Sequence, residues 1–159
     1  MKQEPTTIDK IRDDSSNAIK YRRDIAALAA VGLLDFSLIS LFQMGKIREL
    51  PDLPGKVFDT HKVNSSEDAV LMGLPDGVIS LGGYTATMIL AMAASRYKKQ
   101  SRLLDVALGG VLLGQAAGAA QYLVNMTTVQ KKACVYCIAG AVINFAALVP
   151  LKRLFRSRG

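Results

Sequence analysis

Four long apolar runs dominate the sequence, and they hold almost none of its charge. They cover residues 25–44, 78–94, 103–124 and 133–151. Of the 20 basic and 13 acidic residues in the chain, only Asp35 and Asp105 lie within these runs. A helix rises about 1.5 Å per residue, so each run spans about 25–33 Å, the thickness of the hydrocarbon core of a bilayer. The sequence therefore predicts an all-α membrane protein with a bundle of four transmembrane helices.

Polar segments flank the runs, and their basic residues are unevenly distributed. We expect a hydrophilic cytoplasmic tail over residues 1–23, a four-helix membrane domain over residues 24–151 and a basic cytoplasmic tail over residues 152–159. Together with the loop 95–102, the tails carry 14 Lys and Arg residues, whereas the opposite loops carry 6. The positive-inside rule then places both termini in the cytoplasm, in a multi-pass protein of the plasma (inner) membrane.

The formal net charge of +7 suits contact with the anionic headgroups of a lipid bilayer. No basic stripe is interleaved with aromatic residues, so the pattern does not indicate a nucleic-acid partner.

The loop between the first two runs, residues 45–77, is long for a simple connection between adjacent helices. Ser65 or Ser66 is suited to cap a helix that has acidic residues in its first turn, and Pro75 is suited to end it. We therefore expect this outer loop to carry a short amphipathic helix over residues 66–74.

Small residues recur along the third run. Gly110, Gly114 and Gly118 form two successive GxxxG steps on one helix face. Such a face lets helix backbones approach closely in lipid, so we expect it to pack inside the bundle.

The two carboxylates within the runs call for different interpretations. Asp35 lies midway along the first run, where an ionised side chain is costly, so it should face the bundle interior or be protonated. It is either part of a proton path or a polar partner for a cofactor, or else a neutral group hydrogen-bonded to a neighbouring helix. Asp105 lies within one turn of the membrane boundary, beside Arg102, and we expect it at the interface.

Both cysteines of the chain lie in one Cys-x-x-Cys motif, Cys134 to Cys137, at the start of the fourth run. Residues three apart on a helix face the same side, so the two sulfurs can bridge. The helix N-terminus and the two preceding lysines favour the thiolate of Cys134, which makes it the better nucleophile. An outer, oxidising compartment lets a disulfide persist. We interpret the motif as redox-active.

Other interpretations of the pair stay open. The cysteines can be small buried apolar residues, or an inert disulfide, although closing so short a loop constrains the unfolded chain little. A zinc site needs about four ligands. The chain offers only one distant histidine, His61, beside the pair, so we expect no metal and a solvated His61.

Asn144 lies seven residues after Cys137, about 10 Å further along the same helix and on nearly the same face. A buried amide below a dithiol is suited to hydrogen-bond a quinone carbonyl. The alternative is a hydrogen bond to a neighbouring helix.

With these features in place, the chain resembles the vitamin K epoxide reductase family over about residues 22–151. The resemblance rests on the Cys-x-x-Cys that opens the last of four helices, on Asn144, on the long outer loop, and on the segment 72–77 that leads to Tyr84. It implies a bundle around a quinone, ubiquinone or menaquinone, with the cysteine pair beside the ring. It also implies a thioredoxin-like or other outer-compartment thiol protein as partner. The implied catalytic residues are Cys134 and Cys137, and the implied cofactor-binding residues are Asn144, Tyr84 and Asp35.

The long loop departs from the family pattern. Family members carry a second cysteine pair there, which passes electrons from the partner to the Cys-x-x-Cys. This chain has Phe58 and Ser66 at about those positions. Under the resemblance, partner thiols then reach Cys134 directly as the exposed sulfur, and Cys137 is the deeper sulfur that faces the quinone.

Three functions are compatible with these features. The first is a membrane thiol:quinone oxidoreductase that passes electrons from partner thiols to a quinone. The second is a non-catalytic accessory subunit of a larger membrane complex that keeps the fold and a quinone or lipid site. The third is a carrier site for a quinone or lipid without redox chemistry.

Overall fold

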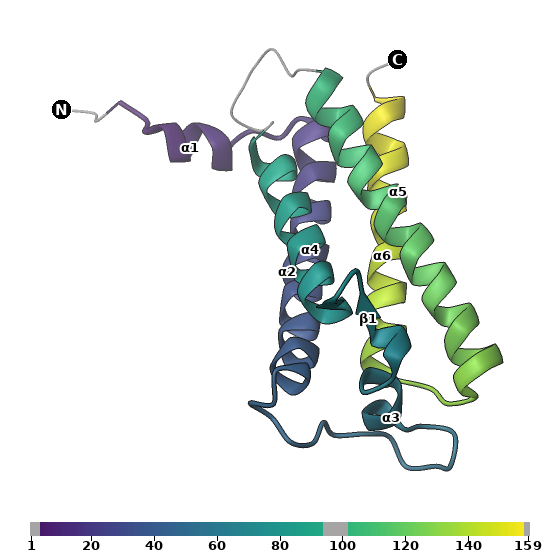
Figure 1. The fold of residues 1–159 in the computed structure, drawn as a ribbon. Helices are drawn as coiled ribbons and strands as arrows, with labels where there is room; N and C mark the ends of the chain where they lie inside the picture. The colour runs from purple at the N-terminus through teal and green to yellow at the C-terminus, as the bar shows by residue number, and fades with distance from the viewer. Residues whose placement is uncertain (1–3, 94–101, 158–159) are drawn as a thin grey trace.

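The structure is a computed structural model and describes residues 4–93 and 102–157. Four long helices stand side by side in it (Figure 1): α2 (Asn17–Gln43), α4 (Asp76–Ala93), α5 (Arg102–Asn125) and α6 (Val135–Arg156). All four are long and apolar enough to cross a membrane, α5 together with the turn that follows it. The predicted all-α bundle is therefore confirmed, and the chain is a multi-pass membrane protein.

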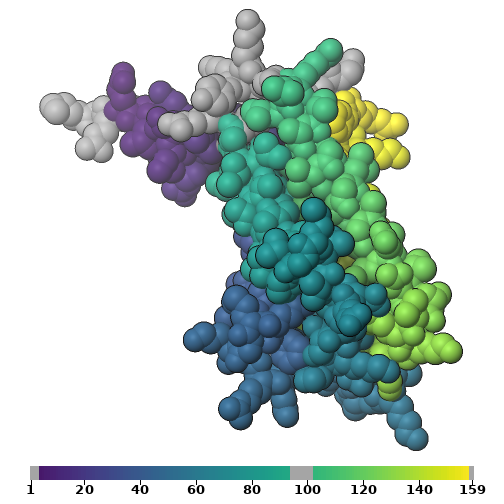
Figure 2. Space-filling model, viewed as in Figure 1, coloured from purple at the N-terminus to yellow at the C-terminus, as the bar shows by residue number. Residues whose placement is uncertain are grey.

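The helices form a ring in which α2 packs against α4 and α6, and α5 packs against the same two helices. Helix α1 (Thr7–Arg12) and the last turns of α6 lie at one end of the bundle, which we call the terminal end (Figure 1). The long loop and the start of α6 lie at the opposite end, which we call the disulfide end (Figure 1). Figure 2 shows the loop folded across the disulfide end, in blue and teal. Large apolar side chains on the helices point outward, as contact with lipid requires, among them Val31, Leu34, Leu113 and Val142.

A short helix lies before the four long helices, and a π-helical turn lies between the last two of them. Helix α1 (Thr7–Arg12) lies before α2, which itself begins at Asn17, inside the segment expected to be a hydrophilic tail. A π-helical turn, η3 (Met126–Gln130), follows α5. Such turns are rare, and they are frequent at functional sites. This one leads directly to the cysteine motif.

Apolar side chains fill the space between the helices in three groups along the bundle. The groups are Ile25, Leu108, Leu112, Leu151 and Leu154 near the terminal end, Ala29, Tyr84 and Ile143 midway, and Ile39, Val63, Met126 and the two cysteines at the disulfide end.

Glycine lets two aromatic rings approach the helix backbone in the middle group. Gly32 of α2 lies against the ring of Tyr84, and Gly140 of α6 lies against the ring of Phe36. The predicted packing of Gly110, Gly114 and Gly118 is wrong, because a Cβ added at any of the three would have no neighbour within 4 Å. The spacing correctly identifies a face of small residues, but the four-helix ring turns that face outward.

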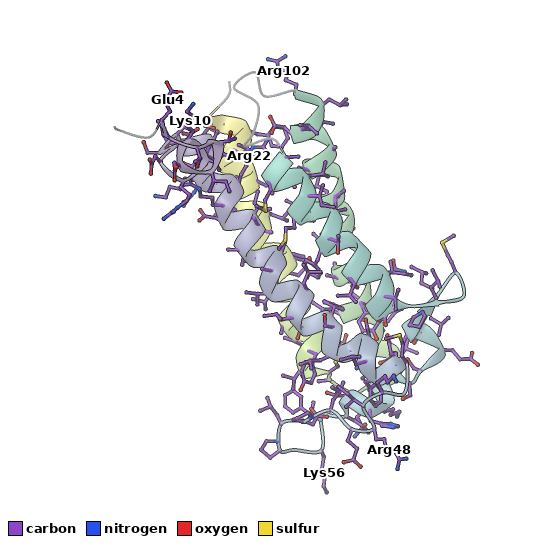
Figure 3. The ribbon with its side chains drawn as sticks, turned by 90° about the vertical axis from the view of Figure 1, so that its left-hand side faces the viewer. Glu4, Lys10, Arg22, Arg48, Lys56 and Arg102 are labelled. Atoms are coloured by element: carbon purple, nitrogen blue, oxygen red, sulfur yellow. A yellow bond between two sulfur atoms is a disulfide. The ribbon has the colours of Figure 1, made fainter. Side chains whose placement is uncertain are left out.

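A buried ion pair closes the terminal end. Arg22 of α2 pairs with Asp105 of α5, and the side chains are only 1% and 2% exposed. Nη1 of Arg22 also donates to the carbonyl oxygens of Leu90 and Ala91 in the last turn of α4, at 3.3 and 3.4 Å. Asp105, which the sequence predicts near the membrane interface, is therefore buried between helices at this end of the bundle, an environment that its partner Arg22 provides. Arg102, one turn earlier, points away from the bundle (Figure 3).

The long loop does not form the helix predicted over residues 66–74 beyond a single 3₁₀ turn after Ser66, so that prediction is wrong over most of its length. It holds instead a short helix, α3 (Thr60–Asn64), a 3₁₀ turn, η1 (Glu67–Ala69), and a hairpin of two short strands, β1 (Val70–Leu71) and β2 (Leu74–Pro75). Met72 and Gly73 form the hairpin turn, with φ of 55° and 81°. Positive φ at both central residues is the conformation of a tight hairpin turn, and Gly73 adopts it without strain.

Candidate redox site

The cysteine pair occupies the N-terminus of α6. Cys134 is extended and caps the helix, because its sulfur accepts a hydrogen bond from the backbone N–H of Cys137 at 3.1 Å. Cys134 and Cys137 are joined in a disulfide, with their Cα atoms 5.2 Å apart. The motif therefore does two things at once: it starts the helix, and it holds two sulfurs at bonding distance.

Neither sulfur is open to solvent. Cys134 is 0% exposed and Cys137 is 8% exposed. The expectation that Cys134 is the exposed sulfur is therefore wrong, since the start of α6 is covered rather than free at the membrane surface.

A segment of the long loop, residues 56–66, provides that covering, and we call it the loop cover. Phe58 forms a parallel β-bridge with Ala133, the residue that precedes Cys134. The N–H of Ala133 donates to the carbonyl of Val57 at 2.8 Å, and the N–H of Asp59 donates to the carbonyl of Ala133 at 3.0 Å. Ser66 closes the other side, where its Oγ accepts from Gln130 at 3.0 Å. The two positions expected to match the family's loop cysteines thus both lie against the segment that leads into the motif.

Asn64, at the end of α3, contacts both sulfurs. Its side chain is buried, and its Nδ2 donates to the carbonyl of Thr60 at 2.8 Å and to the sulfur of Cys134 at 3.3 Å. Its Oδ1 lies 3.8 Å from the sulfur of Cys137. The sequence analysis missed this residue, and no local signal identifies it, because the contact joins residues 70 positions apart.

Met126 contacts the motif from the opposite side. The backbone N–H of Cys134 donates to the Met126 thioether sulfur at 3.2 Å. A thioether is a weak acceptor. Met126 is the first residue of the π-helical turn that follows α5.

The three residues expected to bind a cofactor lie together deeper in the bundle, around Gly140. The hydroxyl of Tyr84 donates to the carbonyl of Gly140 at 3.2 Å. The side chain of Asn144 lies within hydrogen-bonding reach of Tyr84, while its Oδ1 has no hydrogen-bond partner among the described residues. Asp35 approaches from α2, and its Oδ2 is likewise buried and without a hydrogen-bond partner in the described part of the chain. Phe36 completes the group, with its ring 5.5 Å from that of Tyr84.

A groove of about 470 Å³ opens beside the loop cover, lined by residues that include Phe42, Gln43, His61 and Asn64. His61 is exposed there and packs edge-on against Phe42, with the ring centres 5.2 Å apart. Within residues 4–93 and 102–157, no three His, Cys, Asp or Glu side chains are grouped to hold a metal ion.

Two comparisons with known proteins bear on the site. The chain matches the family described as the vitamin K epoxide reductase family over residues 24–150, a range that includes both cysteines and all of the deeper polar group. No curated protein matches the chain.

Proposed function

The chain belongs to the vitamin K epoxide reductase family, and on that basis we propose that it is a membrane thiol:quinone oxidoreductase. The observation that carries the proposal is the disulfide of Cys134 and Cys137, which lies at the end of a four-helix bundle with a buried polar group directly beneath it. Partner thiols supply the electrons, and ubiquinone or menaquinone accepts them.

The residues present suit a quinone. Oδ1 of Asn144 and Oδ2 of Asp35 are buried polar atoms, and each lacks a hydrogen-bond partner within the described residues. Buried polar atoms usually have a partner, so two such atoms near Gly140 support a ligand with polar edges on an apolar ring. Asn144 and Tyr84 would hold the quinone oxygens, and Asp35 would hold or pass a proton. A bound quinone supplies a sink for two electrons and two protons.

The proposed reaction cycle conserves electrons and protons with partner thiols and a quinone as its reactants. Two partner thiols are oxidised to a disulfide by way of a mixed disulfide with Cys134, and the Cys134–Cys137 bond is reduced to two thiols. The two thiols then lose two electrons and two protons to the quinone, and the bond between them forms again. Because both sulfurs are buried, the loop cover must part from residues 130–133 before a partner thiol can attack.

Purified protein in lipid nanodiscs, with a dithiol as donor and ubiquinone as acceptor, tests the proposal. We expect quinone reduction by the wild-type protein and loss of it in Cys137→Ala. We also expect Asn144→Leu to reduce the rate by about tenfold or more, because one hydrogen bond to the reacting group is lost. Equal rates in the wild type and in Cys137→Ala would refute the proposal.

We further propose that the disulfide end faces away from the cytoplasm and that both termini are cytoplasmic, from the 14-to-6 distribution of basic residues. Two single-cysteine variants in a background without Cys134 and Cys137 test this orientation. A membrane-impermeant maleimide added to intact cells should label Lys56→Cys in the loop and should not label Lys10→Cys in the tail. The reverse labelling pattern would show that the protein has the opposite orientation in the membrane.

A non-catalytic accessory subunit is the second candidate. Two observations favour it: the loop cysteines of the family are absent from the sequence, and the remaining pair is buried. Purification distinguishes the two candidate functions. A protein that purifies only with stoichiometric partners and shows no quinone reduction would be an accessory subunit, whereas one that is active alone is the oxidoreductase.

A further inference from the structure

We propose that Asn64 is a positioning residue that decides which of the two cysteines carries the negative charge once the disulfide is reduced. The inference rests on the proposed function only in requiring a reducible pair; it requires no quinone. It starts from one buried amide that contacts both sulfurs with opposite hydrogen-bonding groups.

The donor side of the amide faces Cys134. The sulfur of Cys134 accepts from Nδ2 of Asn64 at 3.3 Å and from the N–H of Cys137 at 3.1 Å, and it lies at the N-terminus of α6. A thiolate is stabilised by N–H donors and by the positive end of a helix dipole. In the reduced state these two donors favour the charged form of Cys134.

The acceptor side of the amide faces Cys137. Oδ1 of Asn64 lies 3.8 Å from that sulfur, a distance suited to a weak bond donated by a thiol S–H. A carbonyl oxygen repels a thiolate and accepts from a thiol, so Cys137 keeps its proton. One side chain thus assigns the charge to Cys134 and the proton to Cys137.

The orientation of the amide is fixed by a third contact. Nδ2 also donates to the carbonyl of Thr60 at 2.8 Å, one turn earlier in α3. A flipped amide would turn its oxygen toward that carbonyl and toward Cys134, and would lose both bonds. The loop cover therefore carries an oriented dipole onto the sulfurs in addition to excluding solvent.

No charged group replaces this effect. The titratable side chains on the elements packed around the pair are Asp59, His61 and Lys62 at α3, Glu67 and Asp68 at η1, Lys131 and Lys132 before the motif, Tyr136 on α6, Tyr122 on α5 and Asp35 on α2. Among the described residues, Asn64 is the side chain that hydrogen-bonds the sulfur of Cys134. The neutral amide of Asn64 therefore acts together with the helix N-terminus and the N–H of Cys137 in setting the polarity of the pair.

The test is a pH titration of the reduced full-length protein in nanodiscs. The ultraviolet absorbance of the thiolate gives the pH midpoint at which the thiolate forms. In Asn64→Leu we expect the midpoint of Cys134 to rise by about one to two pH units, the effect of losing one hydrogen bond to a charged group. Asn64→Asp should raise it further, because a carboxylate repels the thiolate. Asp has nearly the shape of Asn, so this variant keeps the test informative if the Leu variant does not fold.

Gln130→Leu is the matched control. It removes the bond from Gln130 to Ser66 of the loop cover and the bond to Asp68 just beyond it, and it touches neither sulfur. We expect its midpoint to equal that of the wild type. The inference is overturned if the Asn64 variants leave the midpoint unchanged, or if Gln130→Leu shifts it as far as they do. Quinone reduction is measured separately, so a protein that shows the shift but no quinone activity would refute the proposed function alone.

Discussion

The two ends of the bundle are closed by different kinds of interaction. At the terminal end, three helices are joined by the buried pair of Arg22 and Asp105 and by bonds from Arg22 to the last turn of α4. At the disulfide end, a loop is held over the cysteine pair by a backbone bridge, an amide and a glutamine side chain. The comparison indicates that the terminal end is held by a buried ion pair, whereas the loop over the disulfide end is held by separate hydrogen bonds, one of them from Nζ of Lys132 to the carbonyl of Lys56 at 2.6 Å.

The largest effect on stability is expected from removing the ion pair at the terminal end. Arg22→Leu leaves the carboxylate of Asp105 buried without its partner, and we expect the free energy of unfolding to fall by about 3–5 kcal/mol. The double variant Arg22→Leu with Asp105→Leu should recover most of this loss, because no uncompensated charge remains. Denaturant titration in detergent measures both. A double variant as unstable as the single one would show that the pair holds the helices by geometry rather than by charge.

Between the two ends, close packing at Gly140 predicts the next largest effect. In Gly140→Ala the new Cβ would lie about 2.5 Å from the ring of Phe36, and we expect a loss of about 1–3 kcal/mol from overpacking. Gly110→Ala is the matched control, since its Cβ would have no neighbour within 4 Å and alanine favours a helix. The same unfolding measurement compares the two. Equal stability of both variants would mean that the middle of the bundle repacks freely.

A smaller effect on stability is expected when the disulfide end is loosened. Gln130→Leu removes one hydrogen bond to Ser66 of the loop cover and one to Asp68 just beyond it, and we expect a change of about 1 kcal/mol or less in the free energy of unfolding. The alkylation rate of reduced Cys134 should nevertheless rise several-fold, because the loop cover opens more often. Mass spectrometry after timed alkylation measures that rate. An unchanged rate would indicate that the remaining contacts hold the loop cover without Gln130.

The smallest effect on stability is expected from Asp9, an exposed side chain near the terminal end. The hydroxyl and the backbone N–H of Thr6 donate to Asp9, and these bonds hold the pKa of Asp9 below its usual value of 3.8. Since the folded-state pKa is lowered, the stabilisation of α1 is complete above the ordinary pKa of an aspartate and is lost as the pH falls through the lowered value. Asp9→Asn should remove this pH dependence. The amide chemical shift of Thr6, followed by NMR from neutral to acidic pH, reports it, and an identical titration in both proteins would contradict the assignment.

The sequence was sufficient to predict the bundle because a membrane imposes a simple rule. A segment that crosses lipid must satisfy its own backbone and be apolar over about 20 residues, and four segments of this chain do so. The family match over residues 24–150 confirms the resemblance that rested on the cysteine motif and its position. The start of α2 at Asn17 escaped the pattern, because helical hydrogen bonding continues into residues that hydropathy counts as polar.

The errors arise where the result depends on neighbours that the sequence does not reveal. The spacing of Gly110, Gly114 and Gly118 identifies a face of small residues but not the direction in which it points. Ser66 and the acidic residues after it predict a helix start, yet the Met72–Gly73 turn pairs the following residues as strands. The burial of Asp105 was not predicted, because its partner Arg22 lies on another helix, 83 positions away in the sequence.

The cysteine pairing and the grouping of the three deeper polar residues were predictable from the sequence, and the surroundings of the pair were less so. Cys134 and Cys137 are bonded, and Asp35, Tyr84 and Asn144 lie together below them, which is the arrangement that the proposed function needs. Asn64 and Met126 were not predictable, since both reach the motif only through tertiary folding.

The enclosure of the disulfide also has a practical consequence. Cys134 and Cys137 are the only two cysteines in the 159 residues, and they are bonded to each other. A thiol reagent applied to this chain therefore has no background from other sites, and the mass it adds counts the electrons stored in the pair. Its rate of reaction, in turn, reports how often the loop cover lifts. The native sequence thus contains its own reporter for the redox state and for the exposure of the site.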